Sequence, residues 1–213
     1  MRVETLTVGP FQENCYLLID ERSGKSVVVD PGSEGDRIVE AIERSATELE
    51  AVWITHAHVD HVGAIASVKR RWNVPVYLHP LDRRLYEAAP RQAEVYGVPF
   101  EEGPSPDREF TDAQEVNVGE VPMTVMHTPG HAPGHVVIFG DGIALVGDCL
   151  FAGSIGRTDL PFSNPPQLAA SLERIVALDP DTVVYPGHGA ATTIAQERES
   201  NPFLNGTARI VGR

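Results

Sequence analysis

Short apolar segments alternate with turn-forming residues along the first third of the chain. Residues 3–8, 15–19 and 26–30 form compact β-branched or apolar runs, which predict strands. The third run leads into the sequence DPGSEG at residues 30–35, which is typical of a turn. Apolar positions then recur at helical spacing over residues 35–46, and residues 51–55 form another apolar run. The pattern therefore indicates a helix between two strands.

A second helical pattern starts at Asp60 and predicts a helix that runs to Trp72, before a strand at residues 74–79. Residues 97–109 combine prolines with acidic residues and show no periodicity, which predicts a surface loop. We expect this loop to be the seam between two similar halves. The second half repeats the style of the first, with the following expected elements: strands near 114–127, 135–140, 142–147 and 182–186, and helices near 165–177 and 192–200.

This order of elements predicts an α+β fold in which two sheets pack on each other with helices outside, an αββα four-layer sandwich. The chain has 213 residues, of which 42% are hydrophobic and 22% are charged. These values are typical of one globular domain, which we expect to span residues 1–213. Cys15 and Cys149 are too few for a disulfide framework and predict reduced thiols, with a single bridge as the alternative.

The charge balance argues against several kinds of partner. With 17 basic and 30 acidic residues, the chain has a formal net charge of −13. This charge repels phosphate backbones, so we expect no nucleic-acid partner and no anionic-membrane partner, while a small anionic substrate stays possible. No apolar run reaches the length of a membrane helix, and the first residues lack the order of a secretory signal, so we expect a cytoplasmic protein.

The sequence THAHVDH at residues 55–61 concentrates three histidines and an aspartate directly after a predicted strand. In an extended segment alternate side chains share a face, so His56, His58 and Asp60 can point the same way, and His61 follows where the helix starts. The structural alternative is that Asp60 caps the helix and the histidines are polar loop residues. Because three adjacent imidazoles would repel one another on protonation, the joint pattern favours metal coordination.

Three further donors stand where strands of the second half lead into loops. His131 lies in TPGHAPGH, Asp148 in LVGDCLF and His188 in YPGHG. Each motif alone is typical of an ordinary turn, but together with the first cluster they give five imidazoles and two carboxylates. Such a set suits two divalent ions that share one carboxylate and keep positions for water. Zinc is the first expectation, with iron and manganese as alternatives.

These residues resemble the metallo-β-lactamase superfamily, whose THxHxDH, GH, GD and GH motifs stand here in order. The sequence is similar in particular to the short glyoxalase II-like hydrolases, the hydroxyacylglutathione hydrolase-like branch. The segments that carry this resemblance are the following: GPFQENCYLL (9–18), VVVDPG (27–32), TPGHAPGH (128–135), GDCLFAGSIGRTDLP (147–161) and ERESNPF (197–203).

The resemblance implies two metal sites and a fold. It assigns His56, His58 and His131 to the first metal, Asp60, His61 and His188 to the second, and makes Asp148 the bridging ligand. It also implies the αββα sandwich with the site at one edge. A metal-bound hydroxide would then attack a thioester of the hydroxyacylglutathione type and release a thiolate. Asp60 would also orient the hydroxide, so that Asp60 and Asp148 are the expected catalytic residues.

Other residues near these motifs have weaker expectations. Asp30 in VDPG either accepts a hydrogen bond from a ligand imidazole or belongs only to the turn. Arg157 in GRTD lies where glyoxalase II-type enzymes have a basic residue near the substrate, so we expect it to bind substrate. His79 and His127 belong to no cluster and are expected to be structural, and His135 is expected to stabilise its turn.

Two other functions are compatible with the sequence. Persulfide dioxygenases also resemble it and use one iron held by two histidines and a carboxylate, which makes an oxidoreductase the main alternative. A non-enzymatic metal-binding module is the second alternative. The leading interpretation is a dinuclear hydrolase acting on a small-molecule thioester, and the sequence does not predict its oligomeric state.

Overall fold

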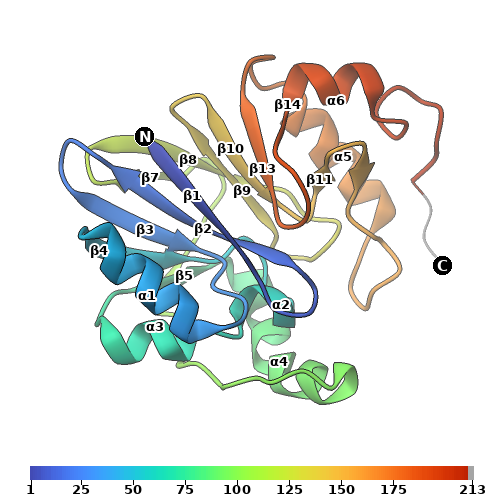
Figure 1. Ribbon diagram of the computed structural model, residues 1–213. Coiled ribbons are helices and arrows are strands. Elements are labelled where there is room, and N and C mark those ends of the chain that lie inside the picture. The colour runs from blue at the N-terminus through green and yellow to red at the C-terminus, as the bar shows by residue number, and fades with distance from the viewer. Residues whose placement is uncertain (211–213) are drawn as a thin grey trace.

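The computed structural model, which describes residues 1–210, contains two six-stranded sheets that face each other (Figure 1). In the first sheet β1, β2 and β3 are antiparallel, and β4, β5 and β6 continue it in parallel. Its strands stand in chain order: β1 (Arg2–Val8), β2 (Glu13–Asp20), β3 (Lys25–Val29), β4 (Glu48–Trp53), β5 (Val76–Leu78) and β6 (Arg108–Glu109).

The second sheet has the order β14-β13-β10-β9-β8-β7. It is antiparallel except for the parallel pair β10 and β13. A small hairpin of β11 (Leu150–Phe151) and β12 (Ser154–Ile155) follows β10. The strands of the second sheet are as follows: β7 (Glu115–Val118), β8 (Val121–His127), β9 (Val136–Gly140), β10 (Ile143–Gly147), β13 (Val183–Pro186) and β14 (Thr192–Thr193).

Helices cover the outer face of each sheet, which confirms the predicted four-layer αββα sandwich (Figure 1). The helices beside the first sheet are α1 (Gly35–Ser45), α2 (Val59–Val62), α3 (Ile65–Arg71) and α4 (Arg83–Tyr96), and a 3₁₀ turn at Pro80–Asp82 precedes α4. The helices beside the second sheet are α5 (Pro165–Ile175) and α6 (Ile194–Ser200).

Alternation along β2 shows how the layers are held together. All eight residues of β2 are buried, because helices cover one face of the strand and the second sheet covers the other. Cys15, Leu17 and Ile19 pack in the core beneath the helices, whereas Tyr16 and Leu18 pack in the core between the sheets. The two-residue repeat of a strand thus serves two cores at once.

The helix expected from Asp60 to Trp72 is broken into α2 and α3, so that prediction was wrong in detail. Ala64 lies between them with φ −109° and ψ 7°, outside the helical region. Its amide donates to the carbonyl of Pro31, 2.9 Å away, instead of to a carbonyl four residues earlier in a helix. The break lets the chain cross close to Gly32, since a Cβ at Gly63 would lie 2.3 Å from the Gly32 carbonyl oxygen.

Helix α4 was not predicted, although it has 14 residues. Pro90 stands inside the helix and argues locally against it. The loop predicted at residues 97–109 begins directly after α4 and ends in β6, the last strand of the first sheet. Both cysteines are buried and free, as expected of reduced thiols. Within residues 1–210, no helix has the length and apolar character that crossing a bilayer requires.

Candidate metal centre

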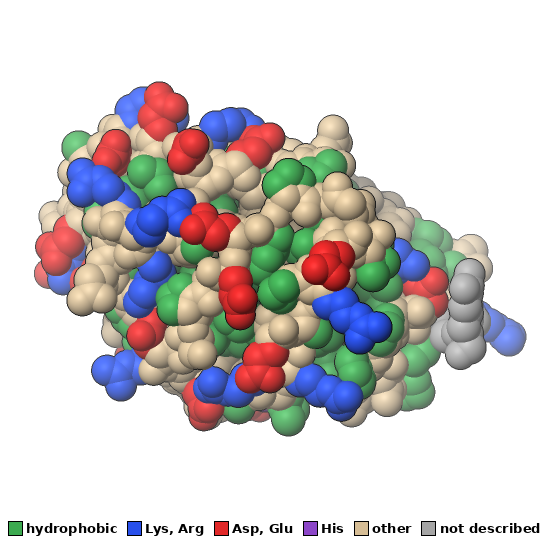
Figure 2. All heavy atoms as spheres, turned by 90° about the horizontal axis from the view of Figure 1, so that it is seen from below, with side chains coloured by type: hydrophobic (Ala, Val, Ile, Leu, Met, Phe, Trp, Pro, Cys, Tyr) green, Lys and Arg blue, Asp and Glu red, His purple; other side chains and the backbone are tan. Residues whose placement is uncertain are grey.

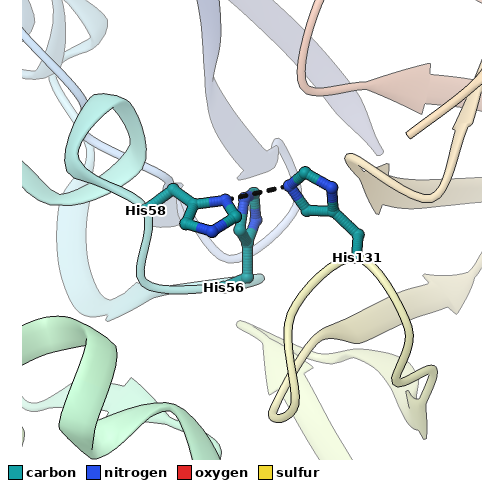
Figure 3. Close-up of side chains that lie close together, drawn as sticks. All are labelled: His56, His58 and His131. Carbon is teal, nitrogen blue, oxygen red and sulfur yellow. Dashed lines mark hydrogen bonds between the residues drawn. The ribbon is translucent and has the colours of Figure 1, made fainter. Parts of the chain in front are cut away.

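The loop after β4 and the loop after β8 bring three imidazoles together at one edge of the sandwich. His56 and His58 follow β4, and His131 follows β8 in the other sheet. Figure 3 shows the three rings turned toward one another, with His58 Nδ1 and His131 Nε2 2.9 Å apart. One nitrogen from each ring lies within 4.8 Å of the others, as a shared metal ion requires. The first predicted ligand group is thus assembled in space.

Asp60, His61 and His188 form a second group beside the first. Asp60 and His61 lie on α2, and His188 follows β13. His188 Nε2 is 3.3 Å from Asp60 Oδ2, and His61 Nε2 is 3.9 Å from the same oxygen. The ligand atoms of these three residues also lie within 4.8 Å of one another.

Asp148 lies between the two groups, at the end of β10. Its Oδ1 is 3.5 Å from His61 Nε2, and its Oδ2 is 3.6 Å from the Nε2 atoms of both His131 and His188. The two oxygens of this carboxylate therefore face imidazoles of both groups, which is the arrangement that a bridging ligand needs. A side chain at Gly187 would obstruct it, because a Cβ there would lie 2.2 Å from Asp148 Oδ1.

Several of these buried ligand atoms have no hydrogen-bond partner among the described residues. They are His56 Nε2, His61 Nε2 and Asp148 Oδ1. An unsatisfied buried polar atom costs roughly 1–3 kcal/mol, so three neighbouring ones require an explanation. They also face one another within 4.8 Å, and imidazole nitrogens with a carboxylate oxygen are the donors that zinc, iron and manganese accept. The donor set therefore fits bound divalent metal.

Hydrogen bonds at the far side of three rings fix which nitrogen faces the centre. His61 Nδ1 donates to Asp30 Oδ2 at 3.0 Å, His131 Nδ1 to the Arg157 carbonyl oxygen at 2.9 Å, and His188 Nδ1 to the Phe11 carbonyl oxygen at 3.1 Å. Each Nε2 is left with a lone pair directed into the centre. Partners of this kind orient ligand imidazoles and raise their basicity.

The structure places Asp30 beside His61, as the first of the two interpretations of Asp30 predicted: its carboxylate accepts a hydrogen bond from this imidazole. Its carboxylate also accepts from the amide and the hydroxyl of Thr55, at 2.7 and 2.6 Å. The residue is buried and has a positive φ of 49°, which turns the chain after β3. Asp30 thereby connects the end of β3, the first residue of the THAHVDH motif and the second ligand group.

Burial and charge divide the imidazoles into two kinds. Burial lowers the pKa of His58 to about 3 and that of His131 to about 4, and it holds the pKa of His56 well below its ordinary value. These rings are neutral, the form in which imidazole binds metal. Burial alone would also lower the pKa of His61, but nearby carboxylates, with Asp60 first among them, raise it.

The carboxylates respond to the same surroundings. Although burial opposes ionisation, the imidazoles of His61 and His188 hold the pKa of Asp60 well below its usual range. Burial raises the pKa of Asp148. Glu13 is 1% exposed, its two carboxylate oxygens have no hydrogen-bond partner among the described residues, and burial raises its pKa well above the ordinary value. Several buried carboxyl groups thus lie close to His61. Bound divalent cations would offset the negative charge of these groups.

Two residues that the sequence did not single out for the site hold its loops in place. The buried carboxylate of Asp82 accepts from the amide of Ala57, 2.9 Å away, and from the amide of Gly134, so it joins the loops of both sheets. His135 Nε2 accepts from the Asp148 amide at 3.1 Å. The sequence predicted only that His135 stabilises its own turn, but the bond to the Asp148 amide shows that it also holds the loop of a predicted ligand. No local sequence pattern distinguishes Asp82.

His79 and His127 lie outside the ligand groups but contact each other. Their rings stack with centroids 4.1 Å apart and an interplanar angle of 7°. His79 follows β5 and His127 ends β8, so this pair joins the two sheets. The expectation that each belongs to no cluster was incomplete, because the pairing depends on how the sheets meet.

A cavity of about 640 Å³ opens onto the ligands. The ligands His58, Asp60, His131, Asp148 and His188 form part of its lining. Arg157 lines it as well, and its guanidinium makes a two-point contact with Asp159 at 2.7 and 2.9 Å. The centre can therefore be reached by a small molecule, and one predicted substrate contact lies on its wall.

Comparisons with known proteins relate the whole chain to metal-dependent hydrolases. Residues 8–188 match the family described as the metallo-beta-lactamase superfamily. The hydroxyacylglutathione hydrolase GloC of Haemophilus influenzae is 37% identical over 210 residues, which cover 96% of this chain and 99% of that protein. The probable metallo-hydrolase YqgX of Bacillus subtilis is 36% identical over 211 residues, which cover 97% of this chain and 99% of that protein.

Solved structures agree with this relationship. The B3 metallo-beta-lactamase BLEG-1 superposes with a TM-score of 0.90 at 35% identity, covering 96% of this chain and all of that chain. TTHA1623 in a di-iron-bound form superposes with a TM-score of 0.88 at 41% sequence identity. The superposition covers 94% of this chain and 100% of that chain. ETHE1 from Myxococcus xanthus superposes with a TM-score of 0.81 at 28% sequence identity. The superposition covers 97% of this chain and 85% of that chain.

Proposed function

Because this chain belongs to the metallo-β-lactamase superfamily, we propose that it is a dinuclear metal-dependent hydrolase that cleaves thioesters of the hydroxyacylglutathione type. The observation that carries the proposal is the group of buried, unpartnered ligand atoms that faces an open cavity. The similarity to a named hydroxyacylglutathione hydrolase over nearly the full length of both chains supports the thioester as substrate.

The seven ligands would hold two divalent ions. His56, His58 and His131 would bind one ion and Asp60, His61 and His188 the other, with Asp148 between them. When bound, such a pair lowers the pKa of a water molecule and polarises a carbonyl group. Zinc is the proposed metal; the di-iron-bound form of TTHA1623 supports iron as the first alternative, and manganese suits the same donors.

The residues of the chain position the reacting groups. Asp60 stays ionised beside His61 and His188, so its carboxylate can accept a hydrogen bond from an attacking water and orient it. Asp30 and the carbonyl groups of Arg157 and Phe11 hold the ligand rings in one orientation. We propose Arg157 as a contact for the thiol half of the substrate, because it lines the cavity.

The chain has no thiol in a state to replace the water as nucleophile. Cys149, which follows Asp148, is fully buried, and burial raises its pKa to about 12. Its Sγ lies 3.5 Å from the carbonyl oxygen of Thr128. Cys15 is likewise fully buried, with its pKa raised well above the ordinary value. An inert thiol at both positions agrees with attack by water.

A persulfide dioxygenase is the alternative, because the sequence also resembles that class of enzymes. The two functions differ in metal and in products. The test measures metal content, hydrolysis of S-lactoylglutathione and oxygen uptake with glutathione persulfide on the same protein, loaded in turn with zinc, iron and manganese. Thioester hydrolysis with two ions bound supports the proposal. Oxygen uptake with one iron and no hydrolysis contradicts it, and no turnover with either substrate favours a metal-binding module.

A further inference from the structure

Exposed hydrophobic side chains gather around the mouth of the cavity. Among residues 1–210, five large hydrophobic residues are exposed, and four of them line the cavity: Phe11 at 39%, Val95 at 76%, Tyr96 at 49% and Phe162 at 50%. Phe11 and Tyr96 pack edge to face, with centroids 5.5 Å apart. Figure 2 views the molecule from the side of α4 and shows hydrophobic side chains exposed between charged ones. A concentrated apolar patch of this kind marks a binding surface.

Two apolar walls extend from this mouth toward the metal ligands. Leu85, Ala88, Val95 and Tyr96 belong to α4 and form one wall. The other wall consists of residues from β11 onward: Phe151, Ile155, Leu160, Pro161 and Phe162. A molecule whose carbonyl carbon reaches the ligands therefore passes between hydrocarbon and aromatic surfaces. Burying apolar surface is favourable, so these walls favour a substrate with a large apolar group.

Two arginines line the cavity, Arg91 and Arg157, and among the described residues Arg91 has no carboxylate partner. Arg91 stands on α4 between Ala88 and Val95. Within residues 1–210, no hydrogen bond, ion pair or ring contact involves its guanidinium. By contrast, Arg157 is held by Asp159 at 2.7 Å. In a chain with 30 acidic and 17 basic residues, an arginine without a carboxylate partner is free to bind an external anion.

We infer that the substrate carries a bulky apolar group that lies between the two walls and a carboxylate that Arg91 binds. This inference rests on the proposed thioester hydrolysis and narrows its substrate class. A planar guanidinium can bind both oxygens of a carboxylate, which combines orientation with binding. A small hydroxyacyl group such as lactoyl would contact little of either wall, so within the hydroxyacyl class the walls favour an acyl group that carries an aryl ring or a long alkyl chain.

The experiment compares three thioesters of N-acetylcysteamine, a neutral thiol, on the zinc-loaded protein. Their acyl groups are lactoyl, 4-phenylbutanoyl and 4-(4-carboxyphenyl)butanoyl. We expect kcat/KM to be about 10-fold higher for phenylbutanoyl than for lactoyl, from burial of the aryl group. The added carboxylate should raise kcat/KM about 10-fold more, mainly through KM, from its charge-assisted hydrogen bonds.

Variants assign the carboxylate preference to a residue. In Arg91→Met the ratio of kcat/KM for the carboxylated over the neutral aryl thioester should fall from about 10 to about 1, and Arg91→Lys should restore part of it. Arg157→Met should change this ratio less, because Asp159 already offsets that charge. The matched control is Arg44→Met on α1, an exposed arginine paired with Glu40 and absent from the cavity lining, which should leave the ratio unchanged.

Binding of the corresponding thioethers, which cannot be hydrolysed, separates this inference from the proposed function. Isothermal titration should show tighter binding of the carboxylated thioether, and this gain should vanish in Arg91→Met. If no thioester is hydrolysed but the thioethers bind in this way, the proposed function fails and the inference about the cavity survives. A preference for the lactoyl thioester, or a carboxylate preference that Arg91→Met leaves intact, overturns the inference.

Discussion

Asp148 is the residue on which both ligand groups depend. Its carboxylate lies within 3.6 Å of the Nε2 atoms of His61, His131 and His188. We predict that Asp148→Ala lowers the metal content below that of the wild type and reduces kcat more than 100-fold, because both ions lose a ligand. Elemental analysis and thioester hydrolysis measure the two effects, with Asp181→Ala, an exposed carboxylate, as the control. Full metal content with normal turnover would refute the bridging role.

Substitution of Asp82 tests whether the two loops that carry the predicted ligands need its hydrogen bonds to keep their conformation. The Asp82 carboxylate accepts hydrogen bonds from the amides of Ala57 and Gly134, which belong to the loops of the two sheets. In Asp82→Asn an NH₂ group replaces one accepting oxygen, so one of the two amides loses its partner. We predict about 10- to 100-fold weaker metal binding, together with faster hydrogen exchange at one of these amides. Unchanged metal affinity would show that the loops hold their shape without Asp82.

The role proposed for Arg157, substrate binding, is one that kinetics can separate from the role proposed for the metal ligands. Arg157 lines the cavity, and only its carbonyl group contacts a ligand ring. We therefore predict that Arg157→Ala raises KM for a glutathione thioester several-fold with little change in kcat, as the loss of a binding contact does. Steady-state kinetics with S-lactoylglutathione provides the measurement. If KM stays at the wild-type value, Arg157 has no part in substrate binding.

At the scale of elements, the apolar runs of the first third predicted β1, β2, β3, α1 and β4 well, since each run is long enough to show its period. The break between α2 and α3 could not be read from the sequence. It depends on the bond from the Ala64 amide to Pro31, a contact between segments more than thirty residues apart. Helix α4 was hidden by Pro90 and by its many polar residues, so only its packing against the first sheet reveals it.

The ends of β5 and β8 meet through the stacked rings of His79 and His127. Burial, followed by the His127 ring, lowers the pKa of His79 to about 4, below the ordinary value of 6.5. Between these values the unfolded chain binds more protons than the folded chain, so stability falls as the pH falls from 6.5 toward 4. This junction between the sheets is thus sensitive to acid.

We predict that His79→Phe, which keeps an aromatic ring but cannot be protonated, loses less stability than the wild type between pH 7 and pH 5. The difference should be on the order of 1–2 kcal/mol, since one pKa unit corresponds to about 1.4 kcal/mol. Urea unfolding of both proteins without added metal gives the two free energies, and subtraction cancels the titration of the ligand histidines. An identical loss in both proteins would mean that His79 titrates normally in the fold.

Over the whole molecule, the proposed ligands come from loops of both sheets that meet at one edge of the sandwich. Motif spacing sufficed to single out the seven residues that the fold brings together, because the THAHVDH cluster and the three Gly-His or Gly-Asp turns each end a strand. The sequence did not reveal Asp82 or Arg91, because neither stands in a motif. Asp82 matters only where two loops approach each other, and Arg91 only where α4 faces the hairpin of β11 and β12.

The central claim is that seven side chains hold two metal ions at this edge, and anomalous X-ray diffraction at the zinc absorption edge tests it most directly. In crystals grown with zinc we predict two peaks. One should lie among His56, His58 and His131, the other among Asp60, His61 and His188, with Asp148 in contact with both. An absence of peaks at these residues, or zinc bound only elsewhere on the surface, would contradict the account.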